Sequence, residues 1–203
     1  MCIHLSFDHK KATQALNYFA RKNGGNIDKL RVIKLIFFAD RYHLRKYGQP
    51  ITKGEYFAME HGPVNSGTKD IADMTDFLSK QESEYASQFI RAVTDGHKVE
   101  SCADVDTSIF SESDLEALEF AWNEFGKFSA FKLRDISHNY PEWKKHEEPI
   151  LKGYSSRMRM DYEDFFEDVD NNSVNQCHEL TEEDRDVARH YLKETAQIAS
   201  LLN

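Results

Sequence analysis

A carboxylate and three histidines, Asp40, His43, His61 and His138, could perform acid–base chemistry if the fold brought them together. An imidazole held beside a carboxylate in a cleft is a common catalytic pair. The same residue types also build buried polar networks that tie helices to turns. Because the sequence contains no GxSxG nucleophile elbow, no Walker glycine loop and no GxGxxG motif, we expect a polar network and no catalytic residues. An enzyme that uses these four residues in an open cleft is the alternative.

Metal and cofactor chemistry have little support in the sequence. No HExxH or paired CxxC motif is present, and His138 and His146 are eight residues apart with a proline between them. The three cysteines, Cys2, Cys102 and Cys177, are odd in number and far apart, which favours free thiols. We therefore expect no metal site and no cofactor.

Asp40 stands out because of the helix that must carry it. Steps of three and four residues connect an inward-facing series that contains this single acid: Leu30, Ile33, Phe37, Asp40, Leu44 and Tyr47. An unpaired charge on such a face would be costly to bury. Another part of the chain must therefore supply a partner for the carboxylate.

The other elements are predicted from apolar spacing and from helix start and stop signals. Helices are expected over residues 10–23, 28–47, 65–81, 111–125, 130–137 and 181–202, with Phe77 among the inward residues of the third. A short extended segment and turn is expected within residues 51–64, a β-hairpin over 88–102, irregular chain after Pro141, and a short amphipathic helix from Asp161. The predicted fold is mainly α: one compact helical domain over residues 1–203 with a small antiparallel β element.

Charge is distributed unevenly along the chain. The net charge is −9, but residues 1–50 carry +7 and the remainder carries −16, with the highest density of acids from Asp161 to Asp186. No apolar run approaches the roughly 20 residues of a membrane helix, and the first residues lack the apolar core of a signal peptide. We expect a cytoplasmic protein with no membrane contact.

Four basic residues, Arg31, Lys34, Arg41 and Arg45, recur on one face of the second predicted helix. Such a row could bind phosphates, but the acidic total and the absence of a helix-turn-helix or zinc-finger signature argue against nucleic acid. The row is a candidate partner-binding surface. Compensation of the acidic segment within the fold is the interpretation that we favour, and an acidic partner protein is the other one.

Two blocks of sequence resemble a known family. Residues 34–64, KLIFFADRYHLRKYGQPITKGEYFAMEHGPV, carry a KLx(Y/F)FADxxHLxx(Y/F)GxP block followed by HGPV, and Leu133 to Trp143, LRDISHNYPEW, match a later LxxLSH-type block. Together they resemble the Panacea domain family of SocA-like and GepA-like phage-associated proteins. The chain departs from that pattern after Val64, where it has NSGTKDI.

The resemblance implies a motif-bearing core of about residues 10–145, with the acidic segment and C-terminal helix of 160–203 packed on it. It also implies that the matching residues are architectural, and that Asp40 binds His61, backbone N–H groups around Gly62, or His138. The residues of this chain that match the family's structural motif are Asp40, His43, Tyr47, His61, Gly62, Pro63, His138 and Trp143.

The function implied by the resemblance is that of an antitoxin. Such a protein neutralises a cognate toxin protein by direct binding. A non-catalytic adaptor that presents a partner to a protease is the nearest alternative. A homo-oligomer is also left open.

Overall fold

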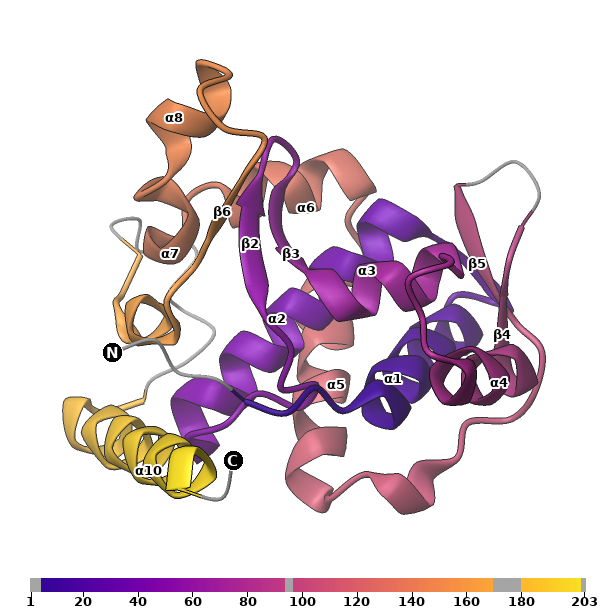
Figure 1. Ribbon diagram of the computed structural model, residues 1–203, viewed down its shortest axis with the longest axis horizontal. Helices are drawn as coiled ribbons and strands as arrows, with labels where there is room; N and C mark the ends of the chain where they lie inside the picture. Colours follow the sequence, from indigo (N-terminus) through magenta and orange to yellow (C-terminus); the bar gives the residue numbers. More distant parts are fainter. Residues whose placement is uncertain (1–4, 94–96, 170–179, 202–203) are drawn as a thin grey trace.

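The computed structural model describes residues 5–93, 97–169 and 180–201, and this part of the chain is mainly helical (Figure 1). The helices are α1 (His9–Lys22), α2 (Lys29–Tyr47), α3 (Ser66–Asp73), α4 (Lys80–Phe89), α5 (Glu112–Phe125), α6 (Ala130–Ser137), α7 (Pro141–Lys144), α8 (Glu147–Leu151) and α10 (Glu182–Leu201), with the 3-10 helices η1 (Thr107–Ile109) and η2 (Tyr162–Phe166). The strands are β1 (Asn26–Asp28), β2 (Tyr56–Met59), β3 (Gly62–Asn65), β4 (Ile90–Ala92), β5 (Lys98–Ser101) and β6 (Arg157–Arg159).

Helix α2 is the central element of the fold. The Asp28 side chain caps it by accepting a hydrogen bond from the Arg31 backbone N–H at 2.9 Å, and Gly48 ends it in a left-handed conformation with φ 73°. Every residue from Val32 to Arg41 is buried, because α1, α5, α6 and α10 all pack around this helix. A helix that is buried on all sides has no separate polar face. The expected row of exposed basic residues on α2 is therefore not formed.

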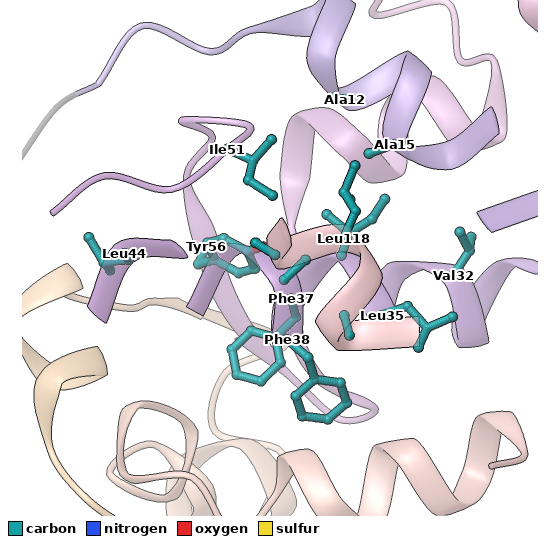
Figure 2. Packing of buried hydrophobic residues seen from close by; sticks show 14 of the residues in the cluster. Ala12, Ala15, Val32, Leu35, Phe37, Phe38, Leu44, Ile51, Tyr56 and Leu118 are labelled. Atoms are coloured by element: carbon teal, nitrogen blue, oxygen red, sulfur yellow. The ribbon is translucent and has the colours of Figure 1, made fainter. Parts of the chain in front are cut away.

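Aromatic side chains of α2 make the centre of the hydrophobic core. The Phe37 ring meets the Tyr56 ring edge-on at 5.8 Å, and Phe38 stacks on Phe125 at 4.0 Å. Figure 2 shows Phe37, Phe38 and Tyr56 grouped in the core. Such pairs add to the stabilisation from buried area. The core therefore fixes the position of α2 relative to β2, which carries Tyr56.

Two three-stranded antiparallel sheets accompany the helices, where one small β element was expected. The first has the order β3-β2-β6 and the second β1-β5-β4. The predicted extended segment and turn is the β2–β3 hairpin, and the predicted hairpin over 88–102 is the β4–β5 pair. Its expected turn at residues 94–96 lies outside the described residues. The prediction missed β1 and β6, which are only three residues long and add to these hairpins at their edges.

The helix predicted over 65–81 is wrong in its second half. Helix α3 ends at Asp73 because Met74 adopts a left-handed conformation with φ 50°, and α4 starts after Ser79, whose side chain forms a capping box with Glu82. Phe77 lies in the connection and is 89 % exposed, so it is not the inward residue that was expected. Residues after Pro141 are also more regular than predicted, since they form α7, α8 and β6.

The 3-10 helix η2 at the start of the acidic segment and the C-terminal helix α10 pack on α2. Phe165 and Phe166 of η2 are buried, as expected, although the segment is a 3-10 helix. Figure 1 shows α10 at the edge of the molecule beside α2. A Cβ atom at Gly48 would lie 2.5 Å from the Ala188 carbonyl oxygen, so the glycine lets the two helices approach closely. Leu202, Cys2 and Cys177 lie outside the described residues, and Cys102 is exposed.

Within the described ranges, we find no helix that combines the length and the apolar character needed to cross a lipid bilayer.

Candidate functional site

The partners of Asp40 are hydroxyl and backbone donors from the segment that follows α2. Asp40 is 1 % exposed, and one of its carboxylate oxygens accepts a hydrogen bond from the Thr52 backbone N–H at 3.0 Å. The other oxygen accepts from the Thr52 hydroxyl and, at 2.8 Å, from the Tyr56 hydroxyl. This carboxylate therefore ties α2 to the start of β2.

The Asp40 network extends to the next helix. The Asn65 side-chain amide donates to the Thr52 hydroxyl at 2.8 Å, and its carbonyl oxygen caps α3 by accepting from the Thr68 backbone N–H. Burial raises the pKa of Asp40 to about 6, while the hydrogen bonds from Thr52 and Tyr56 act in the opposite direction. Four segments of the chain are thus connected through one buried carboxylate.

The expectation that Asp40 binds His61, the backbone around Gly62, or His138 is wrong. Asp40 reaches Thr52 and Tyr56 instead, because these residues follow the turn after α2 and come directly over its buried face. Sequence reasoning missed both partners. The only available signal was the presence of a threonine and a tyrosine in an extended segment near the helix, and no spacing rule connects them to the acid.

The His-Gly-Pro turn is instead held by Lys34 and Trp143. The Lys34 ammonium group, fully buried, donates to the Pro63 carbonyl oxygen at 2.6 Å, and the Trp143 indole N–H donates to the Met59 carbonyl oxygen at 3.0 Å. Burial alone lowers the pKa of Lys34 well below its ordinary value. The β2–β3 hairpin is therefore fixed by α2 on one side and by α7 on the other.

His138 completes the packing around the turn. Its ring stacks on the Trp143 indole with 3.6 Å between the ring centres and 2° between the planes. Burial lowers the pKa of His138 to about 4, and the nearby Lys34 and Arg134 charges act in the same direction. His138 is therefore a neutral packing partner at pH 7.

Gly62 occupies the one place in the turn where a side chain would not fit. Its φ is +90°, and a Cβ atom there would lie 2.6 Å from the Ser137 hydroxyl oxygen and 3.0 Å from the Lys34 nitrogen. Gly62→Ala should lower the free energy of unfolding by about 2 kcal/mol, since it combines left-handed strain with crowding. Chemical denaturation would measure the change.

Gly24→Ala is the matched control for that variant. Gly24 has a similar φ of +84°, but a Cβ atom added there would meet nothing within 4 Å beyond its chain neighbours. Its replacement should cost about 1 kcal/mol, from backbone strain only. Equal losses of unfolding free energy in Gly62→Ala and Gly24→Ala would show that crowding at Gly62 does not contribute to the destabilisation.

The remaining α2 motif residues connect the end of α2 to the start of α5. The His43 ring contacts the Gln49 carbonyl oxygen at 2.5 Å and the Ser113 hydroxyl at 3.0 Å, and the Tyr47 hydroxyl donates to Glu116 at 2.5 Å. Burial lowers the pKa of His43. His43 and Asp40 thus lie in separate buried surroundings, each with partners of its own.

The four basic residues proposed as a partner surface are used inside the fold. Arg41 forms an ion pair with Glu142 at 2.7 Å and donates to the Glu167 carbonyl oxygen, while Arg45 pairs with Asp168 at 2.6 Å. Lys34 is held by Pro63, and Arg31 donates to Asn23 and to the Gly126 carbonyl oxygen. Arg45 therefore compensates a charge of the acidic segment, at Asp168, whereas the charge partner of Arg41 is Glu142 of α7.

An open cleft lies beside His61, at the exposed tip of the β2–β3 hairpin. Its volume is about 700 Å³, and its apolar lining comes from Leu30, Ile33, Met59, Val64 and Ile150. Lys29 and Lys69 at its border both pair with Asp73, at 2.8 and 2.7 Å. Such a cleft can receive an apolar side chain of a ligand or a partner. Of the four residues considered for acid–base chemistry, His61 is the one that lines it.

Across residues 5–93, 97–169 and 180–201, no three His, Cys, Asp or Glu side chains are arranged to hold a metal ion.

Residues 32–144 of the chain match the family model of the antitoxin SocA-like Panacea domain. The match begins within α2 and ends with α7, so it includes Lys34, Asp40, the His61–Pro63 turn and Trp143. Comparison with curated proteins gave no match, and comparison with solved structures gave none. The matched range therefore coincides with the network that surrounds the β2–β3 hairpin.

Proposed function

Because the chain belongs to the family of SocA-like antitoxins with a Panacea domain, we propose that it neutralises a cognate toxin protein by direct binding. The family match over residues 32–144 is the observation that carries this proposal. The protein acts in the cytoplasm as one member of a toxin–antitoxin pair.

A binding role without catalysis agrees with how the motif residues are placed. Asp40 and His43 are each 1 % exposed, and their polar atoms are occupied by Thr52, Tyr56, Gln49 and Ser113. An acid–base pair must reach a substrate to act on it. These contacts support a scaffold role for the motif, and they leave the surface of the molecule for partner recognition.

The toxin is the partner that this proposal requires, and nucleic acid is not part of it. Basic residues that could bind phosphates are engaged internally, as Arg41 is by Glu142 and Arg45 is by Asp168. The overall net charge of −9 favours a partner whose contact surface is basic.

Co-expression with the product of the neighbouring gene tests the proposal. That product alone should arrest growth, and co-expression of this chain should restore growth and yield a complex that survives gel filtration. The Asp40→Ala variant is unsuitable as a negative control because we expect it to lower the stability of the fold, so the vector without this chain serves instead.

Two other outcomes would change the conclusion. Growth arrest that is not relieved, with no complex formed, would contradict the proposal. Restored growth with rapid disappearance of the toxin, reversed by inactivating the cell's proteases, would favour the adaptor that delivers its partner for degradation.

A further inference from the structure

Helix α10 carries a line of apolar side chains on the flank beside the side that packs on the protein. Its inward side is formed by Ala188, Leu192 and Ala196, which are at most 7 % exposed. Three other apolar residues, Val187, Tyr191 and Ile198, are 66, 47 and 59 % exposed, and the Tyr191 ring is partly covered because it lies against Gly48 at the end of α2. Spacings of four and seven residues place these three on one line along the helix, here called the α10 stripe.

The inward positions are small where α10 closely approaches α2 at Gly48, and larger apolar side chains lie on the neighbouring flank. Two of the three inward positions hold alanine, whereas the exposed line holds valine, tyrosine and isoleucine. A helix selected only to pack on its own core places polar residues outward. Single exposed apolar residues are ordinary, but a line of them on one helix is typical of a contact surface.

The charges around the α10 stripe indicate which partner it fits. A shallow hollow at Val187 is lined by Glu182, Glu183, Asp186 and His190, and its three carboxylates belong to exposed residues. Among the basic residues of α10, Arg185 pairs with Asp168 at 2.6 Å and Lys193 with Glu163 at 3.3 Å. Arg189 pairs with the rim acid Asp186 at 3.3 Å, so the charge argument rests on Glu182 and Glu183. Lysine and arginine have an apolar stem and a cationic head, which matches an apolar hollow with an acidic rim.

We propose that the α10 stripe is the surface on which the toxin docks, through a toxin segment that presents apolar side chains flanked by Lys or Arg. This inference rests on the proposed antitoxin function and adds the location of the interface and the chemistry of the partner. Helix α10 lies outside the family match of residues 32–144. Its contacts can therefore differ between members without disturbing the shared scaffold.

A second copy of this chain fits the α10 stripe less well. Antiparallel pairing of two α10 helices would place the acidic residues 182–186 against residues 197–201, which carry no basic side chain. The rim carboxylates would then gain no cationic partner from the second copy. Charge complementarity therefore favours a basic toxin segment.

A pair of double variants tests the α10 stripe against a charge-matched control. Val187→Asp/Ile198→Asp adds two acids to the stripe, and Phe77→Asp/Phe131→Asp adds two acids at apolar residues that are 89 and 62 % exposed on other elements. Affinity for the purified toxin from the neighbouring gene would be measured by calorimetry, with the melting temperature of each variant. We expect the stripe variant to bind at least tenfold more weakly and the control to bind within twofold of the unmodified protein.

A third variant tests the acidic rim. Glu182→Gln/Glu183→Gln should weaken binding severalfold and reduce the dependence of affinity on salt, because two charge pairs with the toxin are removed. If Val187→Asp/Ile198→Asp lowers the melting temperature, Val187→Ser/Ile198→Ser replaces it, since serine removes the apolar contact without adding charge.

The outcomes separate this inference from the proposed function. Growth rescue and unchanged affinity in the stripe variant would overturn the docking site and leave the antitoxin function in place. An equal loss of affinity in the control variant would also overturn the docking site. Failure of the unmodified protein to bind or rescue would overturn both. A dimer of the unmodified protein that Val187→Asp/Ile198→Asp converts to a monomer would assign the stripe to self-association instead.

Discussion

Asp40→Ala should lower the free energy of unfolding by about 2 to 4 kcal/mol, although Asp40 contacts no solvent and no proposed ligand. Removing the carboxylate leaves the Thr52 backbone N–H, the Thr52 hydroxyl and the Tyr56 hydroxyl without their acceptor in the interior. Buried donors that lose their partner retain the full cost of desolvation. Urea denaturation followed by circular dichroism would measure the change.

A surface aspartate provides the control for this variant. Asp104 pairs with Arg21 at 2.7 Å, but its side chain is 90 % exposed. Asp104→Ala should change the free energy of unfolding by less than about 0.5 kcal/mol, since exposed ion pairs contribute little. An Asp40→Ala protein as stable as the Asp104→Ala protein would show that the buried network does not hold the hairpin to α2.

For Asp40, the sequence predicted that a partner is needed but not which residues supply it. Helical spacing and the cost of a buried charge were enough to predict that Asp40 needs a partner within the fold. They could not identify Thr52 and Tyr56, because these residues come over α2 only after the chain turns at Gly48. That turn is a property of tertiary structure, and periodicity within one helix contains no information about it.

The same limit explains the error over the basic residues of α2. Their spacing placed them on one helical face, and a charged face is usually exposed. The partners that bury Arg41 and Arg45 come from later parts of the chain, since Glu142 belongs to α7 and Asp168 follows η2. Helix starts were predicted at the cap residues Ser111 and Thr181. The start of α4 at Ser79 was missed although Ser79 forms a capping box with Glu82, and the end of α3 was missed because the left-handed conformation of Met74 has no sequence signal.

Glu142→Met should be among the most destabilising single substitutions, lowering the free energy of unfolding by about 3 to 5 kcal/mol. Glu142 is fully buried and accepts a hydrogen bond from Arg41 at 2.7 Å. Without it, the Arg41 charge remains in the interior next to Arg45, whose pKa is already lowered to about 10, first by burial and then by the Arg41 charge. Thermal and urea denaturation would measure the loss.

The double variant Arg41→Met/Glu142→Met distinguishes the cost of an unpaired charge from the value of the pair. Removing both charges leaves no unpaired ion, so the double variant should be more stable, by about 2 kcal/mol or more, than the two single losses added together. Lys152→Met/Glu148→Met is the control, because that pair is exposed and its coupling should be below about 0.5 kcal/mol.

This double-mutant cycle also decides between the two roles considered for the basic residues. A large coupling energy between Arg41 and Glu142, with toxin binding retained in the double variant, would assign Arg41 to the scaffold that holds α7 against α2. A small coupling energy with loss of toxin binding in Arg41→Met would instead require α7 and the acidic segment to move away and expose α2 to the partner. In that case the toxin would compete with Glu142 and Glu167 for the same guanidinium group, and affinity would fall steeply with added salt.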